Sequence, residues 1–247
     1  MDLGLSRRTA LVCGASSGLG LASAEALARE GARVAMVARR AEELERHAER
    51  IGGLAIPGDV TSDDDLERVV RHTVERFGSL DIVVWNSGGP SAGGALDTDP
   101  HALEAAYRLL LRPAVRLVTL CVPHLERTGR GRILAITSLA AIEPAPRLAL
   151  SNTLRPGLTG WLKTLSREVG PRGITVNCVA PGRIATPRLD YLYPDGPTDA
   201  QLGEIALGRW GAPQEFGDVV CFLASERASY VTGQTVVVDG GLSRGLF

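Results

Sequence analysis

Short apolar runs alternate along the chain with segments whose apolar residues recur every three or four positions. The runs have the length of strands, and their almost continuous apolar character is typical of parallel strands covered on both faces. We expect seven strands, at Thr9–Cys13, Arg33–Ala38, Leu54–Ile56, Leu80–Trp85, Ile133–Thr137, Ile174–Val179 and Val236–Val238.

The segments between these runs predict amphipathic helices. We expect one that carries Leu19 and Leu27 on its apolar face and ends at Gly31, and others at about 41–51, 62–77, 100–125, 153–169 and 214–224. Pro113 predicts a kink inside the segment 100–125. Repeated strand–helix units without a linker predict one α/β domain over residues 1–247, a Rossmann-type, doubly wound parallel sheet of about seven strands with helices on both faces.

Composition excludes several classes of protein. The formal net charge is -1, which argues against a chain built to bind nucleic acid or an anionic membrane. The four cysteines are far apart, without C-x-x-C spacing or a histidine cluster, so we expect neither a disulfide framework nor a metal site. No apolar stretch reaches 18 residues and no signal peptide is evident, so we expect a cytoplasmic protein outside the membrane.

A glycine-rich turn follows the first expected strand. Glycine there permits a tight turn and lets a pyrophosphate approach the backbone, while the next helix offers free N–H groups to that anion. An ordinary turn would also explain the glycines, but the position between a buried strand and an amphipathic helix favours nucleotide binding. The candidate residues are Gly14, Ser16, Ser17, Gly18, Leu19 and Gly20.

The end of the second expected strand predicts which cofactor is bound. A carboxylate there would bind a ribose 2′-hydroxyl, whereas arginine would bind a 2′-phosphate. The chain has Arg39 and Arg40 and no acid, which favours NADP(H) over NAD(H). Arg39 is the better candidate because it follows the strand directly. The alternative is that both arginines form the solvated start of a helix.

Five further motifs occur in order along the chain: Asp59-Val60, Asn86-Ser87-Gly88-Gly89, Ser138, Pro181-Gly182-Arg183-Ile184-Ala185-Thr186 and Val238-Asp239-Gly240-Gly241. With the glycine turn, they make a sequence that resembles the classical short-chain dehydrogenase/reductase family, most closely its 3-oxoacyl-[acyl-carrier-protein] reductase-like members, from about Leu5 to Leu242. The resemblance implies a catalytic role for Ser138. It implies cofactor contacts from Asp59, Val60, Asn86, Gly88, Pro181, Gly182, Ile184 and Thr186.

The resemblance also implies a substrate-covering region at about 184–211 and a homodimer or homotetramer. The two central helices that would form such an assembly carry apolar residues on their faces, although core packing also explains many of them. These residues are Leu109, Leu117, Leu120, Leu158, Trp161 and Leu165.

The catalytic tyrosine and lysine of the family have no counterpart here. The corresponding positions hold Ser151 and Arg155, and the family's active-site asparagine falls on Leu110. A serine hydroxyl is a weaker acid than a phenol, whose pKa is about 10. Arg155 can still bind ribose hydroxyls and stabilise an oxyanion. Because Pro156 disfavours helix at the residue before it, we expect the helix to begin or bend near Arg155, with Ser151 on a loop.

Three other residues could replace the missing groups. Lys163 lies eight residues beyond Arg155, roughly 12 Å along a helix, so a surface or subunit contact is expected. Tyr191 and Tyr193 could supply a phenol from the covering region, but packing within that region is favoured.

We therefore expect an NADP(H)-dependent oxidoreductase that reduces the carbonyl of a small molecule, a 3-oxoacyl thioester or similar, to an alcohol. Ser138, Ser151 and Arg155 are the candidate catalytic residues. Two alternatives stay open. One is a catalytically impaired NAD(P)-binding sensor or partner subunit; the other is a Rossmann enzyme of another type, such as a dehydratase, that uses Arg155 to hold an oxyanion.

Overall fold

Seven parallel strands form one sheet, in the order β3-β2-β1-β4-β5-β6-β7, in the computed structural model, which describes residues 2–246. They are β1 (Thr9–Cys13), β2 (Arg33–Ala38), β3 (Leu54–Pro57), β4 (Ile82–Trp85), β5 (Arg132–Ile136), β6 (Thr175–Pro181) and β7 (Thr235–Val238). The predicted fold class is confirmed. The strand order reverses between β1 and β4, the topological switch point at which doubly wound sheets bind ligands.

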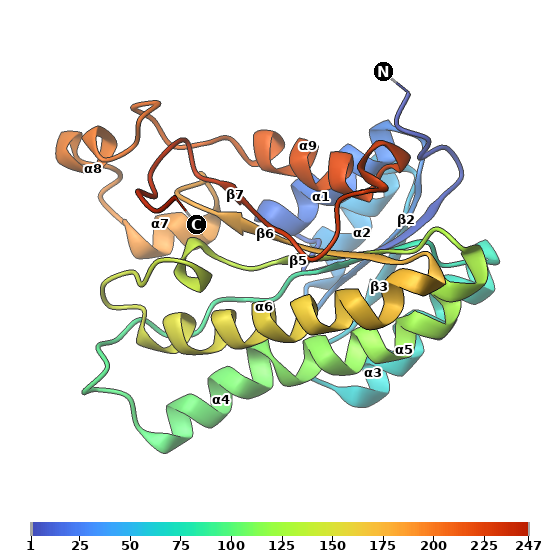
Figure 1. The fold of residues 1–247 in the computed structure, drawn as a ribbon, viewed down its shortest axis with the longest axis horizontal. Helices are drawn as coiled ribbons and strands as arrows, with labels where there is room; N and C mark the ends of the chain where they lie inside the picture. Colours follow the sequence, from blue (N-terminus) through green and yellow to red (C-terminus); the bar gives the residue numbers. More distant parts are fainter. Residues whose placement is uncertain (1, 247) are drawn as a thin grey trace.

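Helices cover both faces of the sheet (Figure 1). They are α1 (Gly18–Arg29), α2 (Ala41–Ile51), α3 (Asp63–Phe77), α4 (Pro100–Leu110), α5 (Arg112–Thr128), α6 (Ala149–Val169), α7 (Pro187–Leu192), α8 (Asp199–Gly203) and α9 (Pro213–Ala224), with 3₁₀ turns η1 (Leu139–Ala141), η2 (Gly170–Arg172) and η3 (Glu226–Ala228). Helices α1, α2 and α9 pack on one face, and α3, α5 and α6 on the other. Within residues 2–246, no helix has the length and apolarity needed to cross a bilayer.

Both faces of the strands are buried, which explains their continuous apolar sequences. In β1, Ala10 and Val12 pack against the α1 and α9 side, while Leu11 and Cys13 pack against the α3 and α5 side. All five residues of β1 are buried, so a polar side chain on either face would lose its contact with water.

The expected helix over 100–125 is two helices that meet at Leu111. Pro113 lies in the first turn of α5, where a backbone N–H has no intrahelical partner in any case. The break is therefore placed where proline costs least. Of the apolar residues expected at a subunit interface, Leu117 and Leu158 are fully buried in the core of this chain. Leu109, Leu120, Trp161 and Leu165 are only partly buried, and the homo-oligomer stays a prediction.

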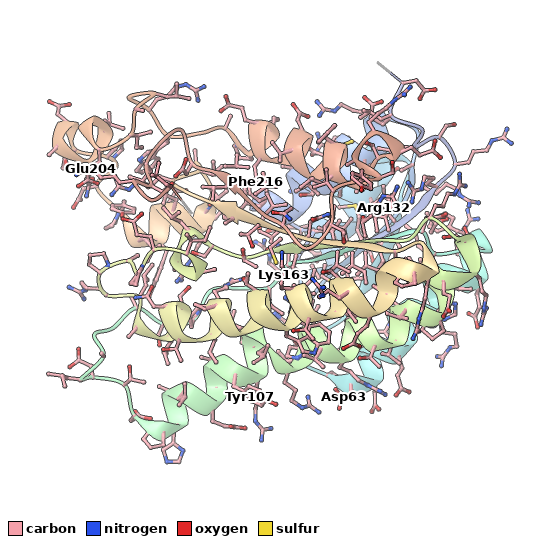
Figure 2. All side chains as sticks on the ribbon, viewed as in Figure 1. Asp63, Tyr107, Arg132, Lys163, Glu204 and Phe216 are labelled. Atoms are coloured by element: carbon pink, nitrogen blue, oxygen red, sulfur yellow. The ribbon has the colours of Figure 1, made fainter. Side chains whose placement is uncertain are left out.

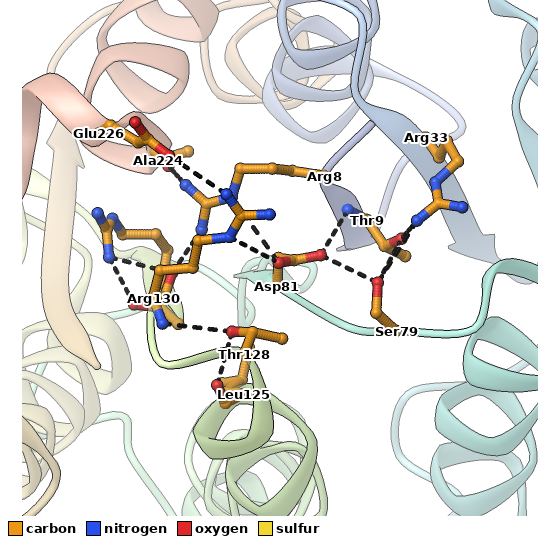
Figure 3. A network of polar contacts seen from close by, with 12 residues as sticks. Arg8, Thr9, Arg33, Ser79, Asp81, Leu125, Thr128, Arg130, Ala224 and Glu226 are labelled. Atoms are coloured by element: carbon orange, nitrogen blue, oxygen red, sulfur yellow. Dashed lines mark hydrogen bonds and ion pairs between the residues drawn. The ribbon is translucent and has the colours of Figure 1, made fainter. Parts of the chain in front are cut away.

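A polar network closes the sheet at the amino ends of β1 and β5 (Figure 3). Arg8 is fully buried there, and its guanidinium donates to the carbonyl of Ala224 at 3.1 Å and lies 4.0 Å from Asp81. Asp81 accepts hydrogen bonds from the Thr9 N–H at 2.9 Å and from the Ser79 hydroxyl at 3.1 Å. Burial lowers the pKa of Arg8 to about 10. This edge is occupied by structural contacts, which leaves the carboxyl ends of the strands for chemistry.

Candidate active site

The glycine turn after β1 has the shape that a dinucleotide requires. Gly14 and Gly18 have φ values of +60° and +56°. A β-carbon on Gly20 would lie 2.2 Å from the Gly14 carbonyl oxygen, so no larger residue fits. Helix α1 begins at this turn without a side-chain cap from Ser17 and without an acidic residue in its first turn. Its N-terminal N–H groups and positive dipole end therefore suit an anion.

Arg40 lies over the glycine turn. Its guanidinium donates to the Ser17 hydroxyl at 2.8 Å and to the Ser16 hydroxyl at 3.2 Å, and it also pairs with Glu43 at 2.8 Å. Arg39, the residue preferred from the sequence, is exposed like Arg40, but it is Arg40 that contacts the glycine turn. The extended backbone of Arg40, at the N-cap of α2, points its side chain to the turn.

Four more of the predicted cofactor contacts lie at the same edge of the sheet. Asp59 follows β3, and its carboxylate accepts hydrogen bonds from the N–H and hydroxyl of Thr61 at 2.9 and 2.8 Å. Asn86 follows β4, and its amide donates to the Gly14 carbonyl at 3.4 Å, which joins the ends of β4 and β1. Val60 is partly buried against the core, and the space beside Gly88 is open.

The segment from Pro181 to Thr186 brings the end of β6 to the glycine turn. A β-carbon on Gly182 would lie 2.5 Å from that of Asp239, so glycine permits the close approach of the chain after β7. Ile184 is buried and fixes the segment on the core. A β-carbon on Gly18 would lie 3.5 Å from the methyl group of Thr186, so the segment covers the turn. Helices α7 and α8 follow it at the carboxyl edge (Figure 1).

Ser138 lies just beyond β5 and caps η1. Its Oγ accepts a hydrogen bond from the Ala140 N–H at 3.1 Å, which leaves the hydroxyl hydrogen for another acceptor. A hydroxyl fixed in this way at the end of a central strand can polarise a carbonyl oxygen.

Ser151 is in the first turn of α6, not on a loop as expected from the sequence. The helix begins at Ala149, and its start is held from outside: the Ala149 N–H donates to the Gly93 carbonyl at 3.2 Å, and the Asn152 amide exchanges two hydrogen bonds with the backbone of Ala145. Pro156 removes only the backbone hydrogen bond to the Asn152 carbonyl. These contacts, together with the buried apolar side chains of α6, outweigh that loss. The buried apolar side chains are Leu150, Leu154, Leu158 and Leu162.

Arg155 follows Ser151 by one helical turn and is buried on the same face of α6, at 6% exposure for each residue. Its guanidinium donates to the carbonyl of Ile136, the last residue of β5, at 2.9 Å, and its Nε is buried without a partner. Burial, followed by the positive charge of Arg188, lowers the pKa of Arg155 to about 10. The group is therefore still a cation at neutral pH, and the carbonyl that it contacts belongs to Ile136, two residues before Ser138.

Sequence reasoning did not identify Arg188, in the first turn of α7. Its guanidinium donates to the Pro90 carbonyl at 2.8 Å and lies against Gly89, where a β-carbon would be 2.7 Å away. The sequence signal that could have identified Arg188 is its position two residues after Thr186, a predicted cofactor contact. Tyr191 is exposed and lies over this guanidinium at 5.3 Å, whereas Tyr193 packs on Trp210 with ring centroids 5.9 Å apart. Tyr193 therefore packs within the segment 184–211, the role that the sequence analysis favoured for it.

Lys163 does not replace the missing lysine. Lys163 lies on α6 (Figure 2), and its ammonium donates to the Gly233 carbonyl at 2.7 Å, a contact within the chain. The four cysteines are buried, and none forms a disulfide within residues 2–246. In the part of the chain that the structure describes, no group of His, Cys, Asp and Glu could hold a metal ion.

A family model described as Enoyl-(Acyl carrier protein) reductase matches residues 14–243. The chain belongs to the short-chain dehydrogenase/reductase family. This short-chain dehydrogenase/reductase, an oxidoreductase by family, is 35% identical to Dehydrogenase/reductase SDR family member 4 of Sus scrofa, over 96% of the chain and 88% of that relative. It is 32% identical to 3-oxoacyl-[acyl-carrier-protein] reductase of Thermotoga maritima, over 96% and 98% of the two chains.

Two solved structures extend the comparison. L-sorbose reductase from Gluconobacter frateurii, complexed with NADPH and L-sorbose, has a TM-score of 0.92 and 33% identity, with both chains fully covered. The 3-ketoacyl-(acyl-carrier-protein) reductase from Brucella melitensis, complexed with NADH, has a TM-score of 0.90 and 29% identity, over 98% of this chain and 100% of the other. This short-chain dehydrogenase/reductase thus has the same fold as those two reductases.

Proposed function

We propose that the protein is an NADP(H)-dependent oxidoreductase that reduces the carbonyl of a small molecule, a 3-oxoacyl thioester or a similar compound, to an alcohol. The observation that carries the proposal is the buried cation of Arg155 bonded to the last carbonyl of β5, two residues from the Ser138 hydroxyl. Relatives that share the fold include reductases complexed with NADPH or NADH, which supports the same chemistry here.

The carboxyl edge of the sheet fits the cofactor. The α1 N-terminus and its glycine turn suit a pyrophosphate, and Arg40 beside Ser16 and Ser17 suits a 2′-phosphate. The remaining contacts that we assign are Asp59, Val60, Asn86, Gly88, Pro181, Gly182, Ile184 and Thr186. When bound, the cofactor supplies the hydride.

The protein's own residues then orient and polarise the carbonyl. The Ser138 hydroxyl donates to the carbonyl oxygen, and the cation of Arg155 stabilises negative charge as it develops there. The proton comes from Ser151, which lies on the same face of α6, or from a water held by Arg155. Without the family's phenol, we expect turnover that is lower by about 10²–10⁴-fold than with an optimal general acid.

The test is oxidation of NADPH and of NADH by the purified protein with 3-oxoacyl thioesters and simpler ketones. Ser138→Ala should lower kcat by about 10²–10³-fold, the effect of removing one donor to the oxyanion. Ser229→Ala, an exposed serine after η3, is the matched control and should leave kcat unchanged. Tight NADPH binding without reduction of any carbonyl would refute the proposal in favour of a sensor or partner subunit.

A further inference from the structure

Two positively charged side chains, Arg155 and Arg188, contact the backbone at the carboxyl edge of the sheet. Arg155 comes from α6 and bonds to the end of β5, and Arg188 comes from α7 and bonds to the loop after β4. Since β4 and β5 are neighbours, the two cations are close enough for Arg188 to lower the pKa of Arg155. No Asp or Glu among residues 2–246 forms an ion pair with either guanidinium.

The other two buried arginines, Arg8 and Arg132, have more interaction partners than Arg155. The Nε of Arg8 also makes no hydrogen bond, but it lies 4.0 Å from the carboxylate of Asp81, and Arg132 donates hydrogen bonds to three backbone carbonyls. Arg155 has a single hydrogen bond, to Ile136, and a buried Nε with no partner. Burying a cation with too few hydrogen-bond partners costs free energy unless a ligand supplies the missing partners. Arg155 has further N–H groups beyond the one that an oxyanion would use, and Arg188 supplies a second cation.

We propose that Arg155 and Arg188 bind a carboxylate on the substrate, so that, among the carbonyl compounds of the proposed function, oxo acids whose carboxylate adjoins the reacting carbonyl are preferred to 3-oxoacyl thioesters. This inference rests on the proposed function. The guanidinium fork matches a carboxylate in geometry as well as charge. Adjacency follows from the chain, because Arg155 bonds to Ile136 and the carbonyl-polarising Ser138 is two residues further on.

The cofactor's phosphates are a second source of the same anionic chemistry. Thr186 lies over the glycine turn at Gly18, and Arg188 is only two residues beyond it. The two sources differ in what Arg188 would affect. A substrate site changes selectivity between acids and neutral ketones, whereas a phosphate site changes the dissociation constant of NADPH.

The first measurement compares pyruvate with methyl pyruvate as NADPH-dependent substrates. The keto carbonyl of methyl pyruvate is more electrophilic than that of pyruvate, so a preference for the acid cannot come from intrinsic reactivity. We expect kcat/KM for pyruvate to exceed that for the ester by about 10- to 100-fold, the range of a charge-assisted hydrogen bond. Equal values for the acid and the ester would overturn the inference while leaving the reductase intact.

Variants assign the effect to Arg188. Arg188→Gln keeps an amide that can donate to Pro90 and should remove the preference for pyruvate by raising KM, with the ester unchanged. Arg188→Lys keeps the positive charge and should retain part of the preference for pyruvate. Arg29→Gln, in which a surface arginine paired with Asp218 at 2.5 Å loses the same charge, is the control. If Arg188→Gln weakens NADPH binding and leaves the acid-to-ester ratio unchanged, the pair serves the cofactor and the inference fails.

Calorimetric titration with oxalate, a dicarboxylate that is not reduced, separates this inference from the proposed function. We expect oxalate to bind the wild-type protein saturated with NADP⁺ and to bind Arg188→Gln at least about tenfold more weakly. If no carbonyl compound is reduced, this result still supports the anion site. Equal oxalate binding by the wild type and Arg188→Gln would overturn it.

Discussion

Replacing Arg40 by glutamine is the sharpest test of cofactor preference. The guanidinium lies 2.8 and 3.2 Å from the two serine hydroxyls of the glycine turn, so a 2′-phosphate there would receive a charge-assisted hydrogen bond. Such a bond contributes about 1.5–3 kcal/mol. The side chain is 55% exposed and also pairs with Glu43, so we take the lower end of that range. At 1.4 kcal/mol per tenfold, KM for NADPH should rise by about 10- to 30-fold.

The assay measures initial rates with NADPH and NADH for the wild type, Arg40→Gln and Arg39→Gln. Arg39 is adjacent and exposed, so its substitution makes the same charge change outside the turn. We expect KM for NADH to be unaffected by either variant and the effect on NADPH to weaken with added salt. A larger loss of NADPH affinity in Arg39→Gln than in Arg40→Gln would refute the assignment from the structure. An equal rise in KM for both cofactors would refute a 2′-phosphate contact.

Two further predictions concern the turn and the covering region. Gly20→Ala places a methyl group against the Gly14 carbonyl, so calorimetry should detect no NADPH binding, while circular dichroism checks that the fold remains. Glu215 accepts hydrogen bonds from Arg209 and from the Ala212 N–H, which lower its pKa to about 2. Its folded pKa is below the usual value, so its contribution to stability is present above about pH 4.5 and lost as the pH falls toward 2. Glu215→Gln should therefore lower Tm at pH 7, and a Tm difference that persists unchanged at pH 2 would contradict the assignment.

The sheet could be predicted from sequence because burial on both faces leaves a continuous apolar run. The five residues of β1 form such a run, and their observed limits match the prediction. Helix limits were harder. Pro156 predicts a helix that starts late. The first turn of α6 is nevertheless held by contacts with Gly93 and Ala145, two residues that lie outside the helix. Local propensity was overridden by those tertiary contacts.

The candidate site was predictable where a strand end fixes a residue. Ser138 and Asn86 follow strands directly, and the structure places them at one edge of the sheet. The choice between Arg39 and Arg40 depends on the direction of two adjacent side chains, which the sequence does not encode. Arg188 is brought to Gly89 by the fold of the segment after β6, and no periodicity reports such a contact.

The bond between Lys163 and Gly233 has a practical consequence, because this lysine is the only one in the sequence. Its ε-amine is therefore the only lysine side-chain amine available to acylating reagents. A surface coupled through that single point would hold every molecule in one orientation. Every other basic side chain would be spared, so the arginines on which cofactor and substrate binding are proposed to depend would keep their charge.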